Sequence, residues 1–322
     1  MASAPRTIDI AAFIDGNRLR PFNYKLIILS WFMTVFDGFD MQMISFTAPY
    51  MREELGLDKF MLGNVFSAAL IGAMLGGFAL SYLGDRFGRR RIIVWSAYVF
   101  GLLTAATALA RSYEALLVLR FLDGLAIGGM LPLAWALNIE YVPTRMRATV
   151  VTVIMIGYSL GAAIAGPITV WLAPSYGWEG VFLFGGAGTL VCAVPLLLWL
   201  PESVRFLASK GRDPKTIARI LNKVDPTLGA TPQDRFILGD ERPVQGNFRL
   251  GQLFEGSLKW ITPLLWIAYI ASSLATYFKA SWSPIIYEEM QFSRETAAWV
   301  SSMSGLLGAA FVPEERLGHG AV

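Results

Sequence analysis

The chain has 322 residues, of which 55% are hydrophobic and only 16% are charged, and its formal net charge is +3. This composition is far from that of a soluble domain and predicts an integral membrane protein. The lone cysteine, Cys192, excludes an internal disulfide framework. The sequence has no nucleophile–histidine pair, metal-ligand cluster or phosphate-binding glycine loop, so we expect no enzyme, no cofactor, no metal and no nucleic-acid partner.

Apolar runs long enough to cross a bilayer recur along the chain. About 20 helical residues span the hydrocarbon core, so the first seven runs are long enough and the eighth is marginal. The runs lie near residues 24–48, 60–82, 91–110, 114–138, 148–172, 179–200, 257–280 and 296–312. We expect a cytoplasmic segment 1–23, a six-helix transmembrane half 24–200, a cytoplasmic linker 201–256 with a short helix at Pro214–Val224, and the start of a second half at 257–312.

Basic residues indicate the orientation of these helices. Most of the 27 Lys and Arg residues fall in alternate connecting segments, beginning with the N-terminal one. Since cytoplasmic loops carry the excess of Lys and Arg, the N-terminus is predicted to be cytoplasmic. This topology predicts a multi-pass protein of the cell inner membrane, with Lys279 in an outside loop.

Two carboxylates interrupt the first apolar run. Asp37 and Asp40 are the only acids between Tyr24 and Ala48. A charge near the bilayer centre costs at least about 2.5 kcal/mol, so such residues tend to face a water-filled cavity and to mark a proton or ion pathway. Residues three apart share one face of a helix, so a single solvated surface can hold both.

A basic turn separates the second and third runs, with the sequence Gly84-Asp85-Arg86-Phe87-Gly88-Arg89-Arg90-Arg91. Its glycines allow a tight turn, Asp85 can cap the next helix or pair with an arginine, and the arginines can anchor at headgroups. The alternative is a loop that only orients the chain. The order D-R-x-G-R-R resembles the helix 2–3 signature of the major facilitator superfamily, with Ser81 at the usual glycine.

Further segments resemble the same superfamily in the right order. They are Arg120 with Gly124, Gly128 and Gly129; the loop Glu140 to Arg147; Gly157, Gly161, Gly166 and Pro167; and Pro201 to Leu207. The resemblance covers about residues 24–210. It implies an all-α integral membrane protein with the major facilitator superfamily fold, comprising a complete six-helix N-terminal half, helix seven and part of helix eight. The residues that it implies for gating are Asp85, Arg86, Gly88, Arg89, Arg90, Glu140, Arg145, Arg147, Gly157, Gly161 and Pro167.

Within the superfamily, Asp37-Gly38-Phe39-Asp40 followed by Gln42 and Ala48-Pro49 is similar to the aromatic acid:proton symporter family. The Ser281-Trp282-Ser283-Pro284 turn expected in helix seven fits that family too, whereas Lys279 stands where the family is usually apolar. This resemblance implies import of an aromatic carboxylate of the benzoate or hydroxybenzoate class, driven by inward proton flow. The expected partners are this small acid, protons and the bilayer, and the full-length protein is expected to be a monomer.

Arg120 and Asp40 lie at similar depths. Counting about 1.5 Å per residue, Asp40 lies about 6 Å and Arg120 about 9 Å to the outer side of their helix centres, so they can pair. We hypothesise that Arg120 attracts the substrate carboxylate while Asp37 or Asp40 carries the proton. Asp123, one turn from Arg120, can also hold the arginine. The alternatives are that Arg120 and Asp123 are only a structural pair, and that Asp37 and Asp40 have a purely structural role.

Aromatic and amide side chains complete the expected substrate site. Six aromatic side chains can stack on an aromatic ring: Phe32, Phe36, Phe39, Phe46, Trp135 and Tyr158. For each of them, packing within the bundle is the alternative. The expected substrate-binding set is Arg120, Asp123, Phe36, Gln42, Trp135 and Tyr158.

The C-terminal tail departs from the superfamily. After Val312-Pro313 the chain turns polar over residues 313–322, and a second D-R-x-G-R-R turn is absent. We therefore expect a truncated form of a longer transporter, which can be inactive. Two alternatives stay open: a proton-coupled carrier of sugars or non-aromatic organic acids, and a non-transporting membrane fragment.

Overall fold

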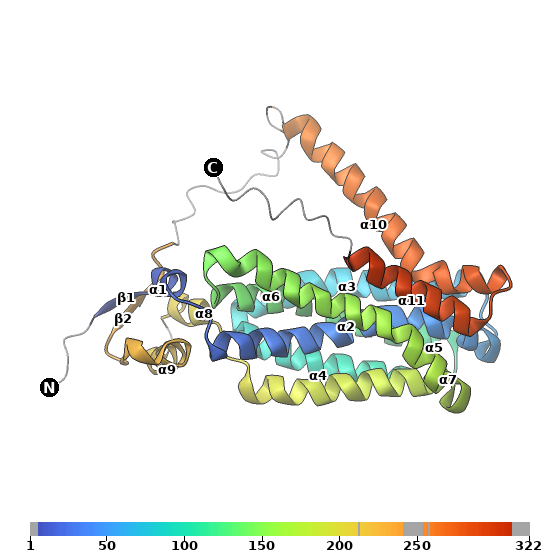
Figure 1. Cartoon of the computed structure of the whole chain (residues 1–322), viewed down its shortest axis with the longest axis horizontal. Helices are drawn as coiled ribbons and strands as arrows, with labels where there is room; N and C mark the ends of the chain where they lie inside the picture. Colours follow the sequence, from blue (N-terminus) through green and yellow to red (C-terminus); the bar gives the residue numbers. More distant parts are fainter. Residues whose placement is uncertain (1–5, 212, 241–253, 255, 257, 311–322) are drawn as a thin grey trace.

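The computed structural model describes residues 6–211, 213–240, 254, 256 and 258–310, and the tail at 313–322, with the truncation expected there, lies outside these residues. Figure 1 shows long helices running side by side, with a small group of short elements at the end nearest the N-terminus. The long elements are α2 (Pro21–Leu55), α3 (Lys59–Phe87), α4 (Arg89–Thr107), α5 (Tyr113–Ile127), α6 (Met130–Glu140), α7 (Arg147–Trp199), α10 (Leu258–Glu289) and α11 (Arg294–Ala310). The short elements are β1 (Thr7–Asp9), α1 (Ile10–Gly16), η1 (Thr144–Met146), α8 (Val204–Ser209), α9 (Pro214–Val224), η2 (Pro226–Leu228) and β2 (Arg235–Ile237).

Five stretches of the described chain are long and apolar enough to cross a membrane. They are Pro21–Leu55, Lys59–Phe87, Tyr113–Glu140, Thr144–Trp199 and Leu258–Glu289. The fourth contains the two runs expected at 148–172 and 179–200. Gly177, with φ 65° and ψ −178°, breaks the helical geometry between them.

The expected helix at 114–138 is divided in two. α5 ends at Ile127 and α6 begins at Met130, with Gly128 and Gly129 between them. Glycine is a poor former of helix interiors, so a Gly-Gly pair is a natural place for the break.

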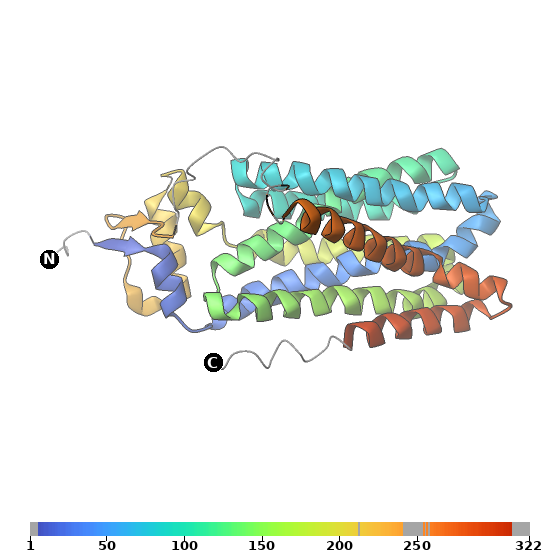
Figure 2. The same ribbon diagram turned by 90° about the horizontal axis from the view of Figure 1, so that it is seen from above.

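The helices pack in pairs along the bundle. α2 lies along α7, α3 along α5, and α11 along α7. At the crossing of α2 and α7, a Cβ on Gly161 would lie only 1.8 Å from the Val35 carbonyl oxygen, so only glycine allows this approach. α10 leans away from the bundle over its first turns and returns to it near α11 (Figure 1), and in the view from above it crosses over the bundle (Figure 2).

The short elements other than η1 form a folded cap on the bundle. The first described strand, β1, pairs in parallel with β2, so that Thr7 lies opposite Arg235. The short helix expected at Pro214–Val224 is confirmed as α9, whose buried face includes Ile217 and Leu221. The rest of the linker is folded as far as Asp240, which the sequence did not predict, because strands of three residues carry almost no periodic signal.

Asp234 joins the N-terminal segment to this cap. Its carboxylate accepts the backbone N–H groups of Arg6 at 3.0 Å and Thr231 at 2.8 Å. These bonds hold the pKa of Asp234 below its usual value. A carboxyl with a lowered pKa in the folded state stabilises the fold above its unfolded pKa, and this contribution is lost as the pH falls through the folded pKa.

We therefore expect Asp234→Ala to release β1 from the cap at neutral pH. The measurement is amide hydrogen exchange of residues 7–9, which should become faster by about tenfold or more, since each lost bond to a charged acceptor removes about 1.5–3 kcal/mol. Asp240→Ala, at an exposed acid paired with Arg205, is the matched control and should leave β1 unchanged. Equal protection in both variants would contradict this role of Asp234.

Candidate substrate and proton site

A buried arginine on α5 lies between carboxylates of two helices. Arg120 Nη1 lies 3.2 Å from Asp40 Oδ2 of α2, and Arg120 Nη2 lies 3.0 Å from Asp123 Oδ2 of α5 itself. The Arg120 residue is 1% exposed and both acids are buried. We call Arg120, Asp40 and Asp123 the buried triad. The structure thus brings together three of the residues singled out from the sequence.

Two threonines of α4 complete the surroundings of the triad. Thr104 Oγ1 donates to Asp123 Oδ1 at 2.8 Å and lies 3.3 Å from Asp40 Oδ1. Thr107 Oγ1 accepts from Arg120 Nη2 at 3.4 Å, and the Phe182 ring lies 5.0 Å from the guanidinium carbon. Within the described part of the chain, Arg120 Nε is buried without an acceptor. Both Nη atoms of the Arg120 guanidinium therefore have partners on α2, α4 and α5.

Asp37 has different surroundings from Asp40, although both lie on α2. Asp37 is buried. Among the described residues, its carboxyl has no hydrogen-bond or ion-pair partner. One acid of the pair expected for proton coupling is thus paired with an arginine, and the other is not.

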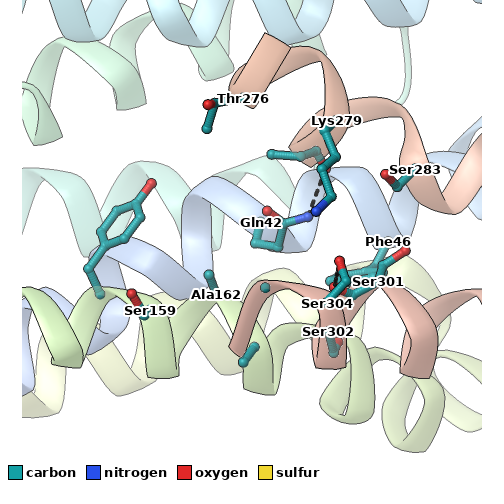
Figure 3. Close-up of a pocket in the computed structure, with 14 residues that line it drawn as sticks. Gln42, Phe46, Ser159, Ala162, Thr276, Lys279, Ser283, Ser301, Ser302 and Ser304 are labelled. Atoms are coloured by element: carbon teal, nitrogen blue, oxygen red, sulfur yellow. Dashed lines mark hydrogen bonds between the residues drawn. The ribbon is translucent and has the colours of Figure 1, made fainter. Parts of the chain in front are cut away.

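A cavity of about 300 Å³ opens between α2, α7, α10 and α11. Figure 3 shows Gln42 and Lys279 pointing into it toward each other, with Ser159 on one side and Ser301 and Ser304 on the other. Gln42 Nε2 donates to the Ala280 carbonyl at 2.8 Å, which ties α2 to α10. The lining residues are Gln42, Phe46, Tyr158, Ser159, Ala162, Ala163, Thr276, Lys279, Ala280, Ser283, Ser301, Ser302, Ser304 and Gly305.

A smaller cavity of about 40 Å³ lies beside the buried triad. Asp40 and Arg120 line it, and it shares Gln42, Tyr158 and Ala280 with the larger cavity. The triad and the larger cavity are therefore neighbours, with these three shared residues between them.

Lys279 lies inside a helix, so its assignment to an outside loop was wrong. α10 continues through the expected turn at Ser281–Pro284 and ends only at Glu289. At about 1.5 Å per residue, this places Lys279 about 15 Å from the end of the helix. No carboxylate of the described residues lies within 4.0 Å of its amine.

Hydroxyl groups form much of the cavity wall. They come from Ser159 of α7, Thr276 and Ser283 of α10, and three serines of α11. In the described part of the chain, Ser301 Oγ and Ser302 Oγ are buried without a hydrogen-bond partner. We call these six side chains (Ser159, Thr276, Ser283, Ser301, Ser302 and Ser304) the hydroxyl wall. The clustering of three serines at 301–304 was a sequence signal for it that we did not use.

Three residues of the expected substrate-binding set line neither cavity: Asp123, which belongs to the buried triad, and the aromatic residues Phe36 and Trp135. The Phe36 ring packs against α7 at Gly188, where an added Cβ would lie 2.1 Å from the ring. Trp135 packs against a small cluster that includes Ile27, Val150 and Ile154. For these two aromatics, the packing alternative agrees with their placement. Tyr158 and Phe46 do line the larger cavity.

The basic turn connects four elements at the cap end of the bundle. Arg89 forms an ion pair with Glu140 of α6 and lies 3.5 Å from Asp85. Ser203 Oγ donates to Glu140 Oε2 at 2.5 Å. Gly88 has φ +106°, and a Cβ there would lie 2.5 Å from Glu202 Oε2, so the turn requires glycine.

The other residues expected to gate are dispersed. Arg90 N–H donates to Glu202 Oε1 at 3.1 Å, next to the turn. Arg145 Nη2 donates to the Asn17 carbonyl at 3.3 Å, and Arg86 is exposed near Tyr82. In the described part, Arg147 Nε is buried without an acceptor. Gly157 faces Trp31 across the α2–α7 contact, and Pro167 lies within α7.

Comparison with known proteins decides the family. The model of the Major Facilitator Superfamily matches residues 30–315. The chain belongs to this superfamily. The expected fold class is thereby confirmed, and the protein is a multi-pass membrane protein like other superfamily members.

Several relatives are transporters of aromatic acids. The chain is 34% identical over 312 residues to the 4-hydroxybenzoate transporter PcaK of Pseudomonas aeruginosa, covering 96% of this chain and 69% of the relative. It is 33% identical to a gallate transporter of Pseudomonas putida, covering 94% of this chain and 67% of the relative. Among solved structures, a D-xylose-proton symporter matches with a TM-score of 0.68 at 17% identity, covering 89% of this chain and 67% of that one, which shows the fold alone.

Proposed function

We propose that this chain is a proton-coupled transporter of a hydroxylated aromatic carboxylate. The observation that carries the proposal is the 300 Å³ cavity, in which Lys279 has no acidic partner among the described residues and which adjoins the buried triad. Relatives named for transport of 4-hydroxybenzoate and gallate support the substrate class.

Lys279 anchors the carboxylate in this conformation. A cation inside a spanning helix is costly unless it faces water or an anion. Arg120 already has two carboxylate partners, and its own cavity of about 40 Å³ is too small for an aromatic ring. The larger cavity lies at the lower end of the usual range for ligand sites, roughly 300–1,000 Å³, which suits a single ring.

The remaining cavity residues recognise the rest of the ligand. Tyr158 and Phe46 flank the ring, where aromatic contacts favour offset or edge-on stacking. The hydroxyl wall binds the ring hydroxyls, because its unpartnered groups can donate or accept. A ligand hydroxyl would satisfy groups that are otherwise buried at a cost.

Asp40 couples this site to protons. When both acids of the buried triad are charged, Arg120 is held between them. Protonating Asp40 removes one partner and frees Arg120 to turn toward Gln42 and Tyr158, the residues shared with the substrate cavity. Asp37 is buried and has no partner among the described residues, which suits a neutral carboxyl better than a carboxylate, and it is the second proton carrier.

The network at the cap end keeps this end of the bundle closed during part of the transport cycle. Arg89, Glu140 and Ser203 join α4, α6 and the segment before α8, so they break when these elements separate. In this proposal the cap faces the cytoplasm of a cell whose inner membrane holds the protein, and residues 24–200 and 257–312 belong to two halves that enclose the site.

Uptake by the chain reconstituted into lipid vesicles tests this function. With a vesicle interior more alkaline than the medium, we expect accumulation of labelled 4-hydroxybenzoate that collapses with a protonophore, and none of labelled xylose. Binding without accumulation would identify a non-transporting form of the chain. Proton-driven accumulation of xylose, with no effect of any aromatic acid, would contradict the proposal and favour the sugar carrier.

A further inference from the structure

We propose that a basic cavity between the cap and the bundle binds the headgroup of an anionic phospholipid. The cavity measures about 600 Å³ and lies between the start of α2, the end of α7 and α9. Four basic side chains line it: Lys25, Arg90, Arg219 and Lys223. This site is separate from the substrate cavity and does not depend on the proposed transport function.

Three of these cations have no carboxylate partner in the described part of the chain. Among the described residues, no acid lies within 4.0 Å of the charged groups of Lys25, Arg219 or Lys223. Arg219 and Lys223 are four residues apart, so they present their charges on one face of α9. Three exposed cations converge on one cavity in the described structure without a counter-charge of their own.

Glu202, the one acid among the described residues that line the cavity, already accepts hydrogen bonds. Its Oε1 accepts the backbone N–H groups of Arg90 at 3.1 Å and Ser203 at 2.9 Å. The Arg90 guanidinium donates to the Leu197 carbonyl at 2.7 Å and keeps further N–H groups for a ligand. The charge balance of the cavity therefore favours an anion with several acceptor oxygens, such as a phosphodiester.

An apolar surface leads directly to this cavity, which favours a lipid over a soluble phosphate. Leu198 and Trp199, both lining residues, are 64% and 54% exposed, and Tyr24 and Ile28 of α2 are exposed nearby in the chain. Tryptophan is enriched at the membrane–water interface. The Lys25 amine lies 4.1 Å from the Trp199 ring centre. If Trp199 lies at the membrane–water interface, Lys25 lies at the level of the lipid headgroups. Acyl chains can follow α2 and α7 while the phosphate enters the cavity.

Native mass spectrometry of the purified chain in detergent, titrated with dioctanoyl phosphatidylglycerol or dioctanoyl phosphatidylcholine, tests the site. We expect the wild type to prefer phosphatidylglycerol. The triple variant Lys25→Gln, Arg219→Gln, Lys223→Gln should weaken that binding by about 10- to 100-fold, since each basic residue near an anionic lipid contributes about 1 kcal/mol. Phosphatidylcholine binding should not change.

A matched triple variant controls for net charge. Arg18→Gln, Lys210→Gln, Arg235→Gln removes three exposed cations of the same end of the molecule that do not line the cavity. Equal loss in both triple variants, or equal wild-type binding of the two lipids, would overturn the proposal. Displacement of phosphatidylglycerol by millimolar inorganic phosphate would assign the cavity to a soluble anion instead. If the triple variant does not fold, Arg219→Gln alone should still weaken binding severalfold, and no effect there would count against the site.

Discussion

Replacing Lys279 with methionine is expected to weaken the binding of 4-hydroxybenzoate about 100-fold. Methionine keeps a long unbranched side chain but removes the positive charge. Among the described residues, the Lys279 amine has no acidic partner. The Lys279 side chain is exposed here, so its pair with the substrate carboxylate becomes buried only when the acid occupies the cavity. Removing one partner of such a pair in the complex costs about 2–5 kcal/mol, and 100-fold corresponds to about 2.7 kcal/mol. The measurement is equilibrium binding of the labelled acid to the reconstituted chain.

Three comparisons make this prediction specific. Lys259→Met changes a lysine near the start of the same helix, outside the cavity, and should leave binding unchanged. Lys279→Arg should retain most of the affinity, because it keeps the charge. The neutral analogue 4-hydroxybenzamide should bind wild type and Lys279→Met alike. Undiminished binding of 4-hydroxybenzoate by Lys279→Met would show that the carboxylate lies elsewhere, and it would remove the observation that carries the proposed function.

Arg120→Met is expected to destabilise the bundle by about 3–5 kcal/mol, because it leaves Asp40 and Asp123 facing each other without a cation. Thermal unfolding in detergent, followed by circular dichroism, measures the change. Adding Asp40→Asn and Asp123→Asn to Arg120→Met should recover much of the lost stability, since no unpaired charge of the triad then remains buried.

Arg111→Met supplies the control for Arg120. Arg111 pairs with Glu179 at 2.9 Å, but its side chain is 65% exposed, so its loss should cost only about 0–1 kcal/mol. If Arg120→Met unfolds at the same temperature as wild type, the triad is not a stabilising unit and Arg120 is free for another role.

The sequence predicted the buried triad better than the cavity beside it. Charges in an apolar run stand out, and counting the helical rise brought Arg120 level with Asp40 across two helices. Phe36 and Trp135 were grouped with the site because nearly uniform apolar runs do not indicate which helix face meets the core and which faces a cavity. That choice depends on packing between helices, which only the structure shows.

Lys279 was misplaced for a related reason. A charged residue at the end of an apolar run resembles a loop anchor, so the helix was ended near residue 280. The structure continues it to Glu289 and places Lys279 among serines of another helix. The pairing of β1 with β2 was equally hidden, because it joins segments more than 200 residues apart through strands of three residues.

Proton exchange during substrate binding tests the central claim most directly. Titrating the reconstituted chain with 4-hydroxybenzoate in two buffers of different ionisation enthalpy measures the protons taken up per molecule bound. We predict uptake of about one proton per aromatic acid by the wild type near neutral pH, and none by Asp40→Asn, whose side chain cannot titrate. Asp37→Asn distinguishes the two proposed proton carriers. It should leave this uptake in place, which would assign the proton taken up on binding to Asp40. Binding without proton uptake in the wild type, or equal uptake by Asp40→Asn, would contradict the account.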